Sequence, residues 1–119
     1  MKSENVVREK SFEFAVGVVR TYQYLVEQKK EYVLSKQLLR SGTSVGALVR
    51  ETEHAESRND FSHKLAIAQK EINESIYWLE LLKETNYLSV IEFDSLHHDA
   101  VEIIKLLTAI IKTTKSKIT

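Results

Sequence analysis

The sequence contains no proline and only three glycines, at positions 17, 42 and 46. Because proline and glycine end helices and form the tight turns of β-structure, a chain of 119 residues with so few of them has little means of breaking a helix. Hydrophobic residues make up 43% of the chain, which is enough for one buried core. We therefore expect residues 1–119 to form a single all-α domain.

Hydrophobic residues recur every three or four positions in four segments, the spacing that places them on one face of a helix. The first segment carries two such rows, Phe12, Val16, Val19, Tyr22 and Val26, and Phe14, Val18 and Leu25. Two rows predict that this helix is covered on more than one side. The second segment runs from about residue 32 to about residue 54. The third and fourth carry the longest rows, which are Phe61, Leu65, Ala68, Ile72, Ser75, Leu79 and Leu82, and Phe93, Leu96, Ala100, Ile103, Leu107 and Ile110.

Polar residues mark the joints between these segments. Two serine–acid pairs, Ser57 with Asp60 and Ser89 with Glu92, have the spacing of a capping box. In this motif the serine oxygen accepts from a free helix N–H, and the acid accepts from the backbone N–H of the serine. Asn86 can adopt the left-handed conformation that closes a helix. Since the joints are short, consecutive helices must fold back on each other. The prediction is an antiparallel up-down-up-down four-helix bundle.

Gly42 and Gly46 lie inside the second predicted helix, where each glycine costs about 1 kcal/mol relative to alanine. A face of small residues at these positions lets another backbone approach closely. That backbone belongs either to a neighbouring helix of the bundle or to a second subunit, and a kink at Gly42 is a third interpretation.

Composition restricts the classes of function. The absence of cysteine removes thiolate nucleophiles and disulfides, and it suits a reducing compartment. The N-terminal residues lack the apolar run of a signal peptide, and no segment approaches membrane-spanning length. We expect a cytoplasmic protein without a membrane partner, a small-molecule substrate or a cofactor.

Charge is balanced overall but uneven along the chain. Seventeen basic residues equal seventeen acidic ones, which argues against binding to nucleic acid through bulk charge. Residues 105–119, however, carry Lys105, Lys112, Lys115 and Lys117 and no acid. This basic segment is either a solvated last helical turn that favours the helix dipole or a set of phosphate contacts.

Motifs for catalysis or metal binding are weak. Glu51 with His54 and Asp94 with His97 have the spacing of di-iron ligands, but an up-down bundle places the two pairs at opposite ends, so we expect no metal. Arg58 and His63 resemble the arginine, spacer, histidine signature of HEPN ribonucleases. The alternative is a solvated helix start, and a short motif of this kind often matches by chance.

The block QLLRSGTSVGA at residues 37–47 resembles the bacterial 23S rRNA intervening-sequence protein family. The match continues through Glu51, Ala55, Ser57, Asp60, Phe61, Lys64, Ile67, Ala68, Lys70, Glu71, Glu74, Tyr77, Trp78 and Leu79, and includes Lys10, Ser11, Phe14 and Ala15. The family is related to the accessory variability protein of diversity-generating retroelements, a basic pentamer that binds reverse transcriptase and nucleic acid. The resemblance implies a four-helix bundle, a homopentamer and RNA contact.

These observations favour a non-enzymatic, homo-oligomeric adaptor that binds RNA or an RNA-associated protein. The candidate phosphate contacts are Lys36, Arg40, Lys105, Lys112, Lys115 and Lys117. The alternative is a HEPN-like ribonuclease that uses Arg58 and His63. Replacing His63 by alanine distinguishes the two, because only the ribonuclease requires that side chain.

Overall fold

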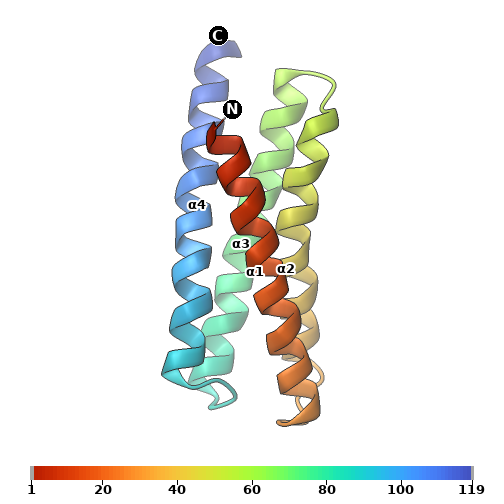
Figure 1. Ribbon diagram of the computed structural model, residues 1–119, viewed down its shortest axis with the longest axis vertical. Coiled ribbons are helices and arrows are strands. Elements are labelled where there is room, and N and C mark those ends of the chain that lie inside the picture. Colours follow the sequence, from red (N-terminus) through yellow and green to blue (C-terminus); the bar gives the residue numbers. More distant parts are fainter. Residues whose placement is uncertain (1, 119) are drawn as a thin grey trace.

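Four long helices form the molecule, and no strand occurs within the part of the chain that is described (Figure 1). The computed structural model describes the backbone of residues 2–118 and the side chains of residues 2–117. The helices are α1 (Lys2–Glu27), α2 (Leu34–Glu51), α3 (Arg58–Glu84) and α4 (Val90–Ile118), and a 3₁₀ turn, η1 (Thr52–His54), follows α2.

Successive helices run in opposite directions, so the predicted up-down-up-down bundle is confirmed (Figure 1). Each helix packs on two neighbours, and the contact between α1 and α4 is the sparsest of the four pairs. Within residues 2–118 the backbones of the diagonal pairs, α1 with α3 and α2 with α4, do not approach each other closely. The bundle is elongated, with extents of 49 × 21 × 19 Å. Both ends of the chain lie at the same end of the bundle (Figure 1).

The predicted caps are present at both joints that carry them. Ser57 Oγ accepts from the Asp60 N–H at 3.0 Å, and Asp60 in turn accepts from the Glu56 N–H at 3.1 Å. At the start of α4, Ser89 and Glu92 exchange two hydrogen bonds, at 3.2 and 2.8 Å, and complete a capping box. Asn86 has a φ of 68°, as the left-handed closure of α3 requires. These local signals are enough to set both helix starts.

The cap of α2 is formed by a residue that the sequence analysis did not single out. The carboxylate of Glu31, only 7% exposed, accepts from the N–H groups of Val33, Leu34 and Ser35 at 3.1, 2.8 and 2.7 Å. The Ser35 hydroxyl donates back to the Glu31 carbonyl at 2.8 Å. Burial by itself would raise the pKa of this carboxyl, but the backbone donors and Ser35 outweigh burial and hold the pKa below its ordinary value. Glu31 therefore caps α2 as a carboxylate.

The core follows the predicted rows in α3 and α4 but not in α1. Every residue of the two long rows is buried except Phe61, which is half-buried against the core. In α1 the core takes the second row, Phe14, Val18 and Leu25, together with Val7 and Ser11. The first row was wrongly expected to face the core: Phe12 is 54% exposed, and Val16, Val19, Tyr22 and Val26 are only partly covered. One apolar face of α1 is thus left at the surface.

The two glycines of α2 lie against α1 inside the bundle, which decides between the interpretations left open by the sequence. A Cβ atom at Gly46 would stand 3.2 Å from the Ser11 carbonyl oxygen. At Gly42 it would stand 2.8 Å from a methyl group of Val18. Small residues here allow α1 and α2 to approach closely, and this contact offsets the low helix propensity of glycine.

Gly42→Ala should destabilise the fold by about 1–2 kcal/mol, because overpacking against Val18 exceeds the gain in helix propensity. Chemical denaturation of Gly42→Ala, Val18→Ala and the double variant measures the coupling between the two positions. The double variant should lose less stability than the sum of the single losses. Strict additivity would show that the close approach at Gly42 is not the cause.

Candidate nucleic-acid interface

The six predicted phosphate contacts do not form one patch. Lys36 and Arg40 lie exposed on α2, whereas Lys105, Lys112, Lys115 and Lys117 lie exposed on α4. Because α2 and α4 are diagonal in the bundle, the two groups face different sides of the molecule. A single stretch of nucleic acid would have to cross a neighbouring helix to contact both groups.

Three of the lysines on α4 form a row. Lys105, Lys112 and Lys115 are spaced by seven and three residues, which places them on the same side of the helix. The row lies beside α3, because Gln69 Nε2 donates to Thr108 Oγ1 at 2.6 Å between the two helices. We call these three lysines the α4 row.

The acid that precedes the α4 row is already paired. Nζ of Lys10 in α1 donates to Oε1 of Glu102 at 2.6 Å. This hydrogen bond lowers the pKa of the Glu102 carboxyl and raises the pKa of the Lys10 ammonium. Past Glu102 the sequence of α4 carries only lysines among its charged residues. The C-terminal half of α4 therefore carries a row of exposed lysines. Glu102, the nearest acid before this row in α4, is paired with Lys10.

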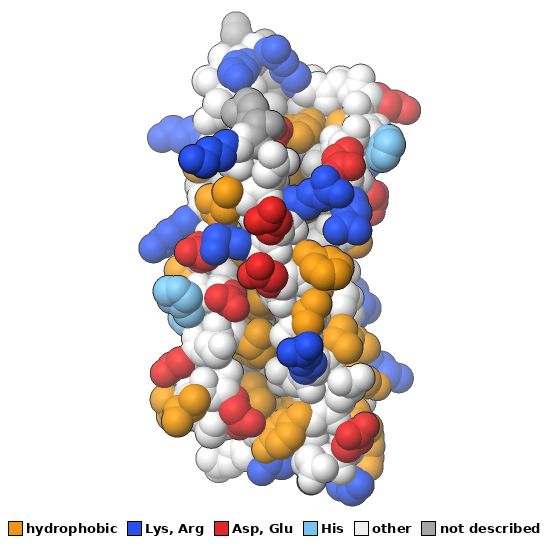
Figure 2. Space-filling model, viewed as in Figure 1, with side chains coloured by type: hydrophobic (Ala, Val, Ile, Leu, Met, Phe, Trp, Pro, Cys, Tyr) orange, Lys and Arg blue, Asp and Glu red, His pale blue; other side chains and the backbone are white. Residues whose placement is uncertain are grey.

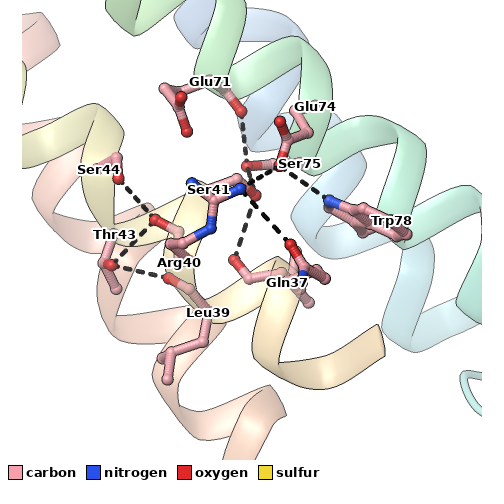
Figure 3. A network of polar contacts seen from close by, with 11 residues as sticks. Gln37, Leu39, Arg40, Ser41, Thr43, Ser44, Glu71, Glu74, Ser75 and Trp78 are labelled. Carbon is pink, nitrogen blue, oxygen red and sulfur yellow. Dashed lines mark hydrogen bonds and ion pairs between the residues drawn. The ribbon is translucent and has the colours of Figure 1, made fainter. Parts of the chain in front are cut away.

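Arg40, by contrast, is engaged in a polar network between α2 and α3 (Figure 3). Its Nη2 atom lies 3.3 Å from Oε2 of Glu74 and 3.5 Å from Oε1 of Gln37. The same Glu74 oxygen accepts from Nε1 of Trp78 at 3.1 Å, so one carboxylate orients both the guanidinium and the indole. The Arg40 side chain is still 62% exposed. Arg40 is therefore partly neutralised by Glu74 and offers less free charge than the α4 row.

Buried hydroxyls lie beneath this network. Ser41 and Ser75, both fully buried, share a hydrogen bond of 2.9 Å between α2 and α3. Ser75 Oγ also lies 2.9 Å from the Glu71 carbonyl oxygen, and Ser41 Oγ lies 3.4 Å from the Leu38 carbonyl oxygen, so one hydroxyl donates to its carbonyl while the other donates to its serine partner (Figure 3). One side-chain oxygen of Glu71 is buried without a hydrogen-bond partner. The serine pair fixes the register of α2 against α3.

A groove of about 390 Å³ opens at the end of the bundle that holds both chain termini. Its apolar lining includes Phe61, Leu106 and Ile110, and its polar lining includes Arg58 and Lys117. Arg58 Nη1 donates to the Lys117 carbonyl at 3.2 Å and so links the start of α3 to the last turns of α4. Lys117 thus belongs to this groove and not to the α4 row.

The structure separates the two residues of the ribonuclease alternative. Arg58 lines the groove beside α4, while His63 is exposed on α3. Five residues along a helix correspond to a rotation of about 140°, so the two side chains leave α3 in different directions. The arrangement favours a solvated helix start over a catalytic pair.

The residues considered for metal binding also lie apart. His54 ends the 3₁₀ turn after α2, and Asp94 and His97 lie in the first turns of α4, at the other end of the bundle. Within residues 2–118, no three histidine, aspartate or glutamate side chains gather as a metal site requires. The described helices also include none that is long and apolar enough to cross a membrane.

Comparisons with known proteins agree with the fold. The family model described as "23S rRNA-intervening sequence protein" matches residues 3–109. The chain is also similar to a crystal structure from Bacteroides thetaiotaomicron, described as a protein with unknown function from the S23 ribosomal protein family. The two are 55% identical over 92% of this chain and 98% of the other, with a TM-score of 0.91. A comparison with curated proteins gave no match.

The family match covers most of the chain and includes the QLLRSGTSVGA block of α2, whose glycines and serine pack against α1 and α3. The chain therefore belongs to the 23S rRNA-intervening sequence protein family.

Proposed function

We propose that this protein is a non-enzymatic, homo-oligomeric adaptor of the cytoplasm that binds RNA through the α4 row. The observation that carries the proposal is the row itself, in which Lys105, Lys112 and Lys115 lie exposed in a segment of α4 without acids. Lysines in such a row can contact successive phosphates, and their net charge is not cancelled locally. An RNA-associated protein with an acidic surface is the other partner that this row suits.

The non-enzymatic part of the proposal is supported by the placement of the side chains. Arg58 and His63 point in different directions, and the polar network at Arg40 consists of groups that satisfy one another. The oligomeric part is supported by the relationship to a pentameric protein that the sequence resemblance implies, and by the apolar face of α1 that the core leaves exposed.

The α4 row can be tested by the salt dependence of RNA binding. Lys112→Gln with Lys115→Gln should weaken binding of a fluorescein-labelled single-stranded RNA and reduce the slope of log K against log salt by roughly 1.4, about 0.7 for each phosphate contact. Fluorescence anisotropy at several salt concentrations measures both effects.

A matched control removes two lysines elsewhere. Lys29→Gln with Lys30→Gln deletes the same charge from the exposed joint before α2, at the other end of the bundle. That pair should leave the slope unchanged. Equal losses in both double variants would show that binding follows net charge alone and would refute a site on α4.

A further inference from the structure

A hydrogen bond between two side chains joins α3 to α4 at the surface, and it lies within the α4 row. Gln69 Nε2 donates to Thr108 Oγ1 at 2.6 Å. Thr108 follows Lys105 by three residues and precedes Lys112 by four, so it lies between them on the same side of α4. Thr108 is exposed and Gln69 is half-buried. A ligand held by the lysines would therefore meet a neutral polar pair between them.

This pair has hydrogen-bonding capacity that the fold does not use. A glutamine amide carries an acceptor oxygen as well as its donors, and a threonine hydroxyl can donate while it accepts. Within residues 2–117, Gln69 and Thr108 have only each other as side-chain hydrogen-bond partners. Thr113 and Thr114 of α4 differ, because their hydroxyls donate to backbone carbonyls one turn earlier at 3.0 and 2.8 Å. Gln69 Oε1 and the hydroxyl proton of Thr108 thus form an available acceptor and donor side by side.

Cations lie around the pair on both helices. Lys105 and Lys112 stand within about 6 Å of Thr108 along the axis of α4. Lys70, the residue after Gln69, is exposed on α3. Figure 2 shows basic side chains projecting from the left edge of the view, where α4 lies in Figure 1. An anionic ligand at the pair would be held from more than one side.

The carboxylates of this part of α3 face another neighbour. Between residues 61 and 79 the acids of α3 are Glu71 and Glu74. They follow Gln69 by two and five residues, so their side chains leave the helix about 160° and 140° away from it. Glu74 bonds Arg40 and Trp78, and one oxygen of Glu71 is buried beside the same network between α2 and α3 (Figure 3). These carboxylates leave the surface at Gln69 to the lysines.

The backbone of RNA offers groups that fit this arrangement. Phosphates are bound by lysine whatever the sugar is, whereas the ribose 2′-hydroxyl both donates and accepts and distinguishes RNA from DNA. A donor and an acceptor side by side between two cations match a ribose hydroxyl that lies between two phosphates. DNA would satisfy the lysines and leave the polar pair without a partner.

From these observations we infer that Gln69 and Thr108 contact a ribose 2′-hydroxyl and make the α4 row selective for RNA over DNA. The Thr108 hydroxyl donates to O2′, and the 2′-hydroxyl donates to Gln69 Oε1. Lys105 and Lys112 hold the phosphates on either side. The inference rests on the RNA binding of the proposed function and names the residues that recognise the sugar.

Two strands that differ only in the sugar test this contact. Oligouridylate and oligodeoxyuridylate of equal length, each labelled with fluorescein, are compared by fluorescence anisotropy at one low salt concentration. The ribose strand should bind roughly three- to tenfold more tightly, the range expected from one net hydrogen bond. Thr108→Val and Gln69→Met should each remove most of this preference by weakening only the ribose strand. The double variant should lose little more than either single variant, because the two side chains act as one unit.

A threonine of the same helix and a modified strand serve as controls. Thr113→Val makes the same substitution five residues later, about 140° around α4 from Thr108, where the hydroxyl bonds to the backbone. This variant should keep the full preference for the ribose strand. A 2′-O-methyl oligouridylate has no 2′ proton to donate to Gln69 and should bind like the deoxyribose strand.

The outcomes separate this inference from the proposed function. If both strands bind the unaltered protein equally, and Lys112→Gln with Lys115→Gln weakens both, the ribose contact is refuted while the α4 row stands. A preference that survives in Thr108→Val and Gln69→Met, or that Thr113→Val removes equally, also refutes the contact. If neither strand binds, the proposed function fails and the inference with it. Circular dichroism establishes that each variant is folded, and Thr108→Ala and Gln69→Ala replace any that is not.

Discussion

Phe14→Ala should destabilise the protein by about 3–5 kcal/mol, the largest effect that we expect from a single substitution in α1. Phe14 is fully buried in the core shared by the four helices, so its removal leaves a cavity that the neighbouring side chains cannot fill by small movements. Urea denaturation followed by circular dichroism measures the change as a shift of the midpoint. The loss should be the same at every protein concentration.

Phe12→Ala is the matched control, because the residue type and the helix are the same and only the face differs. Phe12 is half-exposed and has the Arg50 guanidinium over its ring at 5.5 Å, a contact that contributes about 0.5–1 kcal/mol at an exposed site. At low protein concentration the variant should lose less than about 1 kcal/mol. If the exposed apolar side of α1 is covered in the proposed homo-oligomer, the loss should grow with protein concentration, since association stabilises the folded state by mass action. Equal losses for the two phenylalanines would contradict the assignment of faces.

Glu31→Ala should cost about 2 kcal/mol at neutral pH, because three backbone N–H groups of α2 lose a charged acceptor at once. The effect should depend on pH. The folded protein holds the pKa of Glu31 below the ordinary value of 4.5, so the stabilisation is present above that value and is lost as the pH falls through the lower, folded pKa. The difference in stability between the unaltered protein and Glu31→Ala should therefore shrink in acid.

The control for Glu31 is Glu27→Ala, which removes an exposed carboxylate near the end of α1. It should change stability by no more than about 0.5 kcal/mol, and its effect should not follow the acid profile of Glu31→Ala. Stability curves against urea between neutral pH and pH 3 compare the two variants. A pH-independent loss in Glu31→Ala would show that packing, and not the carboxylate, is what the residue contributes.

Local features of the sequence are sufficient to predict the number of helices, their order and the residues at which α3 and α4 begin. The spacing of hydrophobic residues in α3 and α4 identifies the core side of each helix, since only one row of each is long and continuous. Ser57 and Ser89 mark helix starts because their hydroxyls bond to N–H groups only three residues away. Interactions within one turn can be predicted from sequence because they need no tertiary contact.

Tertiary packing determines which side of α1 is buried and which charged residues lie on the same side of the molecule. In α1 two apolar rows compete, and the sequence does not show which one the core takes. Gly42 and Gly46 let α2 approach α1 closely at Val18 and Ser11. The row with Val18 and Phe14 is buried, whereas Phe12 is left outside. Packing also separates the candidate phosphate contacts into two groups. Because α2 and α4 are diagonal in the bundle, Lys36 and Arg40 lie on a different side of the molecule from the α4 row. Glu31 was not found from the sequence although its hydrogen bonds reach only two to four residues along the chain, because glutamate is not among the residues that usually cap a helix start. Periodicity determines what each helix can bury, whereas packing against its neighbours determines what it does bury.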